Sequence, residues 1–119
     1  CTQCAREDGL SVGERAWAAA RLGAGPHIFR RGEGCHHCNN TGYRGRVGIY
    51  EMLELDPAMS LALAASDLAG FARLARASTG FRPLALAALD YALEGVTTVA
   101  ESMRIAADNA LDDIDDVAA

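Results

Sequence analysis

The chain has 119 residues, of which half are hydrophobic and only 6% aromatic, and its net charge is −5. This length suits one small domain with a core of small side chains, and no apolar run is long enough to cross a membrane. Five aspartates lie within 108–119, and the rest of the chain balances 11 acidic residues against 11 arginines, which argues against a nucleic-acid partner. The first residues do not resemble a signal peptide, so the expected compartment is the cytosol.

The N-terminal half combines turns, one helix and two strands. Residues 1–4 (CTQC) predict a knuckle-like turn, and Ser11 with Glu14 forms a capping-box signature that opens a helix. Later segments rich in β-branched and aromatic residues indicate strands, and a Gly- and Asn-rich loop separates them. The predicted elements are a helix over 12–22 and strands over 27–31 and 46–55.

The C-terminal half is predicted to be helical. Asp56 before Pro57 is a typical helix start, and Thr98 with Glu101 forms a second capping box. Leucines and alanines recur at helical spacing between these signals. The predicted helices span 57–65, 67–77, 83–94 and 98–108.

These elements predict an α+β fold. A small zinc-clasped lobe with a short β-hairpin occupies 1–55, and a bundle of about four helices, 56–107, packs on it. Each lobe alone is too small to bury much apolar surface. The segment 108–119 carries five aspartates and no basic residue, and it is expected to be a disordered acidic tail.

Four cysteines form the strongest chemical signal. Cys1 and Cys4 make one C-x2-C pair, and Cys35 and Cys38 make a second pair after thirty intervening residues. Four thiolates can surround one zinc ion at about 2.3 Å and leave no open position, which predicts a structural rather than a catalytic metal. An iron–sulfur cluster is the main alternative. Two disulfides would need an oxidising compartment, and a redox site needs only one pair.

Other residues around the cysteines have simpler interpretations. His36 and His37 could include a metal ligand, but with four cysteines available they are expected to be solvent-facing turn residues, and His27 a surface strand residue. Tyr43 and Tyr50 are expected to pack under the loop that follows the second cysteine pair.

Arg44 and Arg46 present two guanidinium groups from this loop. They are candidates for a docking contact with a neighbouring subunit or an anionic ligand. Salt bridges to Glu51 or Glu54 explain them equally well. Further along the chain, a contact surface or an ordinary solvated face would account for three more arginines, Arg73, Arg76 and Arg82.

The stretch GCHHCNNTGYRGRVGIYEML, residues 34–53, resembles a segment of the ATPases of type II secretion and type IV pilus assembly (GspE/PilB type). Residues 93–105 (LEGVTTVAESMRI) are similar to the closing segment of that family, and their character leans towards the ATPases of mannose-sensitive-type pili. The resemblance covers 1–107. The matching positions of the first motif are Cys35, Cys38, Thr41, Gly42, Tyr43, Gly45, Arg46, Gly48, Ile49, Tyr50 and Glu51.

The resemblance implies a parent protein that hydrolyses ATP as a homo-hexameric ring. Its partners would be the neighbouring subunits and an inner-membrane platform protein that assembles pilin or pseudopilin subunits. The parent would be cytoplasmic and peripheral to the inner membrane through these partners, without inserting into the membrane itself. The tetracysteine region of that family binds zinc, and ATP and magnesium would bind upstream of Cys1.

The chain itself lacks the ATPase machinery. A P-loop requires a lysine that meets the phosphates, and the sequence contains none, so we predict no catalytic or nucleotide-binding residues in it. Because the chain begins within a metal motif, we expect a piece of a longer protein in which the Cys1–Cys4 half of the site is the more prone to fray or stay empty. A free-standing zinc-ribbon adaptor for a protein partner and a redox or metal-dependent enzyme are the competing hypotheses.

Overall fold

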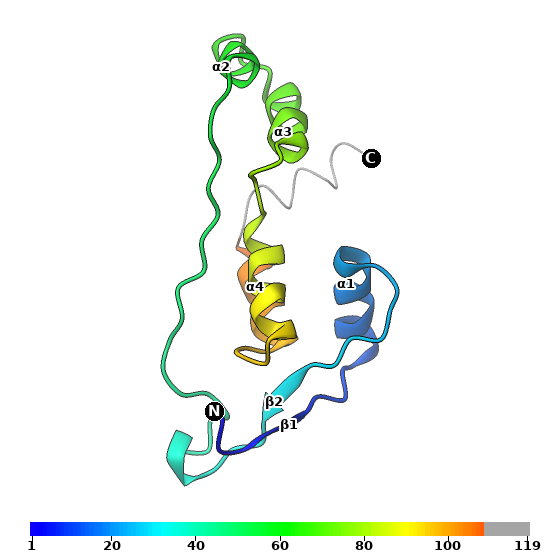
Figure 1. Ribbon diagram of the computed structural model, residues 1–119, viewed down its shortest axis with the longest axis vertical. Coiled ribbons are helices and arrows are strands. Elements are labelled where there is room, and N and C mark those ends of the chain that lie inside the picture. Colours follow the sequence, from blue (N-terminus) through cyan, green and yellow to red (C-terminus); the bar gives the residue numbers. More distant parts are fainter. Residues whose placement is uncertain (109–119) are drawn as a thin grey trace.

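A computed structural model describes residues 1–108, and this part of the chain contains five α-helices, one 3₁₀ turn and a two-stranded sheet (Figure 1). The predicted α+β class is therefore confirmed. In chain order the elements are β1 (Ala5–Glu7), α1 (Val12–Leu22), β2 (Arg30–Gly32), the 3₁₀ turn η1 (His36–Cys38), α2 (Pro57–Ala64), α3 (Leu68–Ala77), α4 (Leu84–Leu93) and α5 (Val99–Ala107).

The helix starts follow the signals in the sequence. Ser11 and Glu14 form the reciprocal capping box of α1, with N···O distances of 3.2 and 2.9 Å. The Asp56 side chain accepts one of the free N–H groups at the start of α2, that of Met59, at 2.7 Å. Thr98 does the same for α5. Each of the five predicted helices is found within about two residues of its expected bounds, the usual uncertainty of helix ends.

The sheet differs from the predicted one. β1 pairs with β2 antiparallel, with Ala5 opposite Gly32 and Glu7 opposite Arg30, so α1 lies between the two strands in sequence. The predicted strand 27–31 overlaps β2 only at its end. The predicted strand 46–55 is wrong, since this segment has no regular secondary structure in the structure. A strand needs a neighbouring strand, and the described part of the chain offers none at this place.

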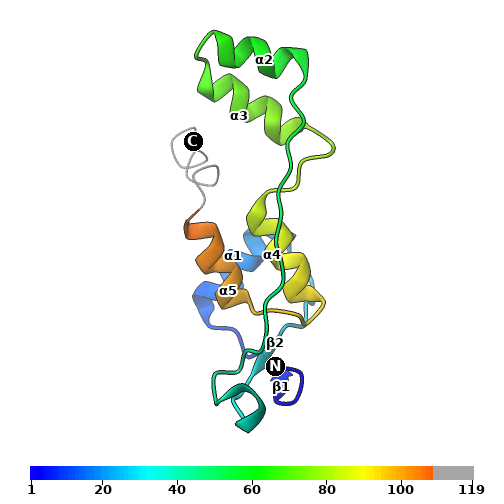
Figure 2. The ribbon, with the colours of Figure 1, turned by 90° about the vertical axis from the view of Figure 1, so that its left-hand side faces the viewer.

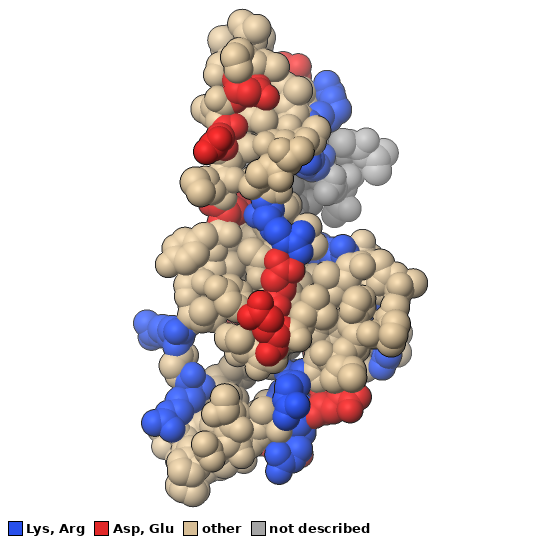
Figure 3. Space-filling view, viewed as in Figure 1, with Lys and Arg blue, Asp and Glu red and all other residues tan. Residues whose placement is uncertain are grey.

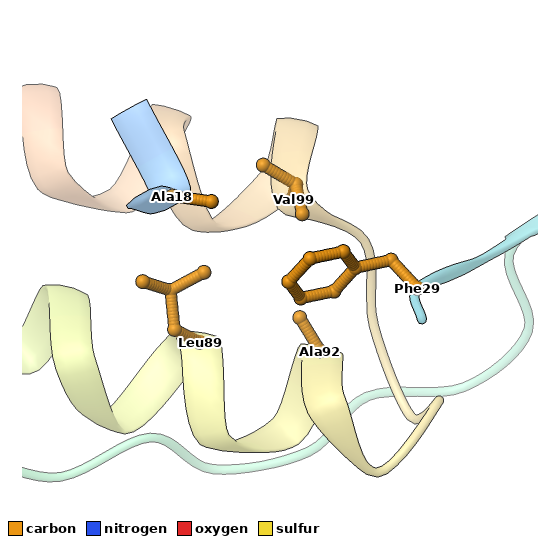
Figure 4. Close-up of a cluster of buried hydrophobic side chains, with 5 residues drawn as sticks. All are labelled: Ala18, Phe29, Leu89, Ala92 and Val99. Atoms are coloured by element: carbon orange, nitrogen blue, oxygen red, sulfur yellow. The ribbon is translucent and has the colours of Figure 1, made fainter. Parts of the chain in front are cut away.

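A small apolar core joins the two halves of the chain (Figure 4). It consists of Ala18 of α1, Phe29 before β2, Leu89 and Ala92 of α4, and Val99 of α5. The Phe29 ring lies between Val99 and Ala92 in Figure 4, and all five side chains are buried. Three alanine or valine residues among five allow α5 to pack against both α4 and α1.

The other two helices stand apart from this core. α2 and α3 pack mainly on each other at the end of an elongated molecule of 55 × 27 × 21 Å (Figure 2). The division of the chain at residue 55 stays a prediction, as does the packing of one lobe on the other. The predicted disordered tail lies outside the described residues, apart from Asp108. Within 1–108, none of the helices has the length and apolar content needed to span a membrane.

Candidate metal centre

Two turns at the same end of the sheet carry the four cysteines. Cys1 and Cys4 precede β1, and Cys35 and Cys38 follow β2. Because Ala5 lies opposite Gly32 in the antiparallel pair, the residues just outside these positions are brought side by side. Pairing of two three-residue strands thus converts a thirty-residue separation into a single cluster.

The sulfur atoms of the cluster lie close together. All four Sγ atoms are within 4.8 Å of one another. The Sγ–Sγ distances are 3.9 Å for Cys1 and Cys35, 3.9 Å for Cys4 and Cys38, and 3.8 Å for Cys35 and Cys38. A tetrahedral ion with metal–sulfur bonds of about 2.3 Å requires sulfur atoms about 3.8 Å apart. The cluster therefore has the donors and the dimensions to bind one metal ion.

The same distances argue against the alternative of two disulfide bonds. A disulfide joins two sulfur atoms at about 2.05 Å, and all four cysteines are free thiols in the structure. Four protein ligands would also fill a tetrahedral ion completely, leaving no position for a substrate. The arrangement suits a metal that holds the chain together.

Backbone amides surround the two buried sulfur atoms. Cys4 and Cys38 are each only 5% exposed. The amide of Gly34 donates to Cys4 Sγ, and the amides of Cys35 and Gly42 donate to Cys38 Sγ, each at 3.3 Å. Such amide donors stabilise the thiolate form that binds metals.

The two cysteines of the second pair differ in acidity. Burial opposes ionisation of Cys38, but the amides of Cys35 and Gly42 more than compensate and lower its pKa from 9.0 to about 6. For Cys35, burial dominates and raises the pKa. Cys38 is therefore the cysteine of this pair that is better prepared to give up its proton to a metal.

Two glycines bring the following loop back onto the sheet. The backbones of Gly32 and Gly42 touch, and a Cβ atom on either residue would overlap the other's carbonyl oxygen. Gly42 also has a φ of +81°, a conformation that favours glycine. Asn39 and Asn40 adopt left-handed conformations in the preceding turn, as their turn chemistry predicts.

The histidines lie outside the cluster. His36 and His37 are exposed and their rings contact each other with centroids 4.0 Å apart, which agrees with the interpretation as turn residues. Within residues 1–108, the group of side chains close enough to share an ion contains only the four cysteines. His27 is also exposed, but it precedes β2 rather than belonging to it.

One contact that the sequence analysis missed ties this loop to the helices. The Tyr43 hydroxyl lies 2.7 Å from Thr98 Oγ1, the same oxygen that accepts the amide of Glu101 and caps α5. Sequence motifs do not reveal it, because the two residues are 55 positions apart. Both Tyr43 and Tyr50 were expected to pack under the loop. Tyr43 is 42% exposed although its hydroxyl contacts Thr98, and the expectation is wrong for Tyr50, which is 81% exposed.

The two candidate interface arginines remain available. Arg44 and Arg46 are exposed and line an open groove of about 640 Å³ alongside α5. Within the described residues neither makes an ion pair, so the alternative of local salt bridges is not observed. The Glu51 carboxylate instead accepts a hydrogen bond from the amide of Leu84 at 2.8 Å and caps α4.

Arg82 was a candidate for another contact surface. Its guanidinium group is hydrogen-bonded to the carboxylate of Asp90.

Figure 3 shows arginine side chains gathered around the end of the molecule that carries the sheet. Several of them are neutralised by nearby acids: Arg6 by Glu33, and Arg31 by Asp8 and Glu14. At this end, Arg44 and Arg46 are among the arginines that have no ion pair within residues 1–108.

The fold and the quartet define a small α+β module with four cysteines placed so that they could bind one metal ion. A family model described as "Type II/IV secretion system protein" matches residues 1–104. The chain belongs to this family, and the resemblance seen in the sequence is confirmed. The assignment to the mannose-sensitive-type pili stays a prediction.

Named relatives agree with the family. The chain is 40% identical to the type IV pilus assembly ATPase TfpB of Acinetobacter baylyi over 74 residues, 60% of the chain and 12% of the relative. It is 32% identical to type II secretion system protein E of Aeromonas hydrophila over 106 residues, 88% of the chain and 21% of the relative. It is 31% identical to the type IV pilus assembly ATPase PilB of A. baylyi over 112 residues, 88% of the chain and 18% of the relative. The chain thus spans about a fifth or less of the length of these relatives.

Proposed function

We propose that this chain is a non-catalytic, zinc-stabilised C-terminal module of a secretion or pilus-assembly ATPase. The observation that carries the proposal is the cluster of four cysteine sulfur atoms within 4.8 Å, in a chain whose residues 1–104 match the secretion family. The relatives are named as ATPases of pilus assembly or as components of type II secretion. The parent protein would hydrolyse ATP to power the assembly of pilin or pseudopilin subunits.

The donor set favours zinc over an iron–sulfur cluster. Thiolates prefer zinc and iron–sulfur centres among the common biological metals. A polynuclear cluster binds its cysteines through different iron atoms, which separates the sulfur atoms further than a single shared ion does. The observed distances of 3.8 to 3.9 Å fit one ion. Bound there, zinc would supply four bonds that cross-link the turn at 1–4 to the turn at 35–38.

The residues of this chain suit a role in contacts with partners rather than in ATP hydrolysis. Without a lysine it cannot form a P-loop, so ATP and magnesium would bind to another part of the parent. We further propose that the parent forms a hexameric ring, cytoplasmic and peripheral to the inner membrane through its partners. Arg44 and Arg46 would contact a neighbouring subunit or the platform protein. Their exposure beside an open groove supports this assignment.

Metal analysis together with an ATPase assay tests the proposal. We expect one zinc ion per purified chain by plasma mass spectrometry and no ATP turnover above the buffer rate. Cys38→Ser should lower the zinc content, whereas the exposed control Ser60→Ala should not. Iron with visible charge-transfer absorbance would overturn the zinc assignment, and stoichiometric ATP hydrolysis by this chain would overturn the non-catalytic role.

A further inference from the structure

The groove beside α5 is lined by positive charge and by apolar side chains. Its volume is about 640 Å³, and its lining includes Arg44 and Arg46, neither of which has an ion pair within residues 1–108. Two of its apolar side chains, Val47 and Val96, are 44% and 53% exposed. Apolar surface beside unpaired positive charge suits a ligand that is itself both apolar and acidic.

The segment 109–119 of the same chain has this composition. It contains four aspartates and no basic residue, and Leu111, Ile114 and Val117 stand three positions apart among them. Side chains three positions apart share one side of a helical segment, and amphipathic segments bind apolar grooves through such anchors. The segment is too short and too acidic to form a core of its own. Its apolar side chains would gain from a groove, and its carboxylates from unpaired arginines.

The acidic residues begin at one end of this groove. α5 lines the groove through Glu101 and Arg104, and Asp108 follows α5 directly. The hydrogen bonds to Glu101 raise the pKa of Arg104, and the negative charge of Asp108 adds to this effect. The first aspartate is therefore within electrostatic range of the groove. The arginines of the loop lie near the other end of α5, where Tyr43 contacts Thr98.

The segment is long enough to reach from one end of the groove to the other. α5 has nine residues and is therefore about 14 Å long, and it runs away from the cysteine end (Figure 2). Eleven extended residues span up to roughly 36–40 Å, so a segment that turns back after Asp108 can reach Arg44. Because it is joined to α5, its effective concentration at its own groove is in the millimolar range. This favours its own groove over that of a second copy in dilute solution.

A second groove, between α2 and α3, suits the segment less well. Its volume is about 610 Å³ and it too has apolar lining, but its lining carries one acidic residue, Asp67, and one arginine, Arg73. Three arginines and one glutamate line the groove beside α5. An acidic segment is therefore attracted more strongly to the groove beside α5.

We propose that residues 109–119 bind in the groove beside α5 of their own chain, with their apolar side chains against its apolar wall and their aspartates towards Arg44 and Arg46. The binding itself does not depend on the proposed function, but its consequence rests on that function. The segment would occupy the surface assigned above to a neighbouring subunit or the platform protein. Such a partner would have to displace it, so the chain would carry a competitor for its own contact surface.

Nuclear Overhauser measurements on the zinc-loaded 119-residue chain test this binding. At low ionic strength we expect cross-peaks between the methyl groups of Ile114 and Val47. High salt should weaken them, because it screens exposed charges. The double variant Arg44→Glu, Arg46→Glu should lose the cross-peaks. Arg73→Glu, at an exposed position of α3 that lines the other groove, is the matched control and should keep them.

A synthetic peptide measures the size of the effect. The peptide carries residues 108–119 and a fluorescent label, and it is titrated into a full-length variant in which 109–119 is replaced by alternating Gly and Ser. Reversing the charge of both loop arginines should weaken binding by at least about 10-fold, since attraction becomes repulsion. Reversing the charge of Arg73 should weaken it by less than about 2-fold.

The outcomes separate the possible explanations. A folded, zinc-loaded chain without these cross-peaks at low ionic strength would overturn the proposal and leave the proposed function intact. Cross-peaks that weaken on dilution, together with a dimer mass in light scattering, would overturn the intramolecular assignment in favour of a second copy. If the arginine variant does not fold, a chain with Asn at 112, 113, 115 and 116 gives the second measurement, and cross-peaks that persist there overturn the charge matching. ATP turnover by the chain would overturn the proposed function and not this binding.

Discussion

The cysteine end and the helical core of this molecule join distant parts of the chain by different chemistry. The core uses buried apolar side chains of α1, α4 and α5. The cysteine end has a sheet of two three-residue strands and two buried thiols, Cys4 and Cys38. An isolated two-stranded sheet is marginally stable in water. The comparison teaches that one end should depend on a bound ion, whereas the other should fold on hydrophobic burial alone.

Removal of the metal is the strongest way to break this comparison. Structural zinc in small peptides contributes on the order of 10–16 kcal/mol of apparent binding free energy at neutral pH, so we expect the largest effect here. A chelator should expose the amides of 1–8 and 30–43 to fast exchange. The helical circular dichroism of α1, α4 and α5 should largely persist. Simultaneous melting of the helices would contradict the division into two differently stabilised regions.

A cavity in the core should have the opposite effect. Leu89 is fully buried between α1, α4 and α5, and Leu89→Ala should lower the free energy of unfolding by about 2–5 kcal/mol. Zinc content should not change. Leu61→Ala, at an exposed position of α2, is the matched control and should have little effect in urea melts. Loss of zinc from the Leu89 variant would show that the cysteine end depends on the core.

Tyr43 offers a smaller test, because its hydroxyl connects the two regions. Tyr43→Phe removes the hydrogen bond to Thr98 and should lower the free energy of unfolding by about 1 kcal/mol. Tyr50→Phe provides a close control, since its side chain is mostly exposed. Equal thermal midpoints for the two variants would mean that the hydrogen bond between Tyr43 and Thr98 contributes nothing to stability.

The smallest expected effect lies in the core region and depends on pH. The hydrogen bond from Arg82 lowers the pKa of Asp90 below its ordinary value. The folded pKa is thus below the unfolded value of about 3.9, so the pair stabilises the fold above that pH and stops doing so as the pH falls through the folded pKa. Both side chains are about half exposed, which limits the gain to roughly 0.2–1 kcal/mol.

Asp90→Asn tests this pair. Urea melts should show the variant less stable than the parent chain at about pH 7, with the difference disappearing near about pH 2. A difference that stays constant over this range would contradict an ionic origin.

The sequence predicted the helices well because their signals are local. Capping signals act within one helical turn: Ser11 forms the expected capping box, and the side chains of Asp56 and Thr98 cap α2 and α5. For α5 only the Thr98 half of the expected capping box is found, and the Glu101 carboxylate contacts Arg104. The cysteine cluster was also predictable, because its spacing reflects ligand chemistry. The strand β1 was not, since three residues carry no periodic pattern and the strand exists through its pairing with β2. The contact of Tyr43 with Thr98 depends on the fold as a whole.

The segment 46–55 shows a different reason for failure. Its β-branched and aromatic residues predicted a strand, but a strand is defined by its neighbours, and none is present beside this segment among residues 1–108. Arg44 and Arg46 were ambiguous for a similar reason. Only the structure showed that the Glu51 carboxylate caps α4, while both arginines have no ion pair in the described part of the chain.

The contact between Gly32 and Gly42 has a consequence for how this module can vary. Neither glycine is a metal ligand, yet a side chain on either would push the loop away from the sheet. This shift would also move the Gly42 amide, which donates a hydrogen bond to the Cys38 sulfur. In a saturation mutagenesis screen scored by zinc retention, both positions should tolerate substitution as poorly as the cysteines. A second substitution could not easily compensate for such a side chain, because backbone atoms of the other glycine, rather than a replaceable side chain, occupy the space.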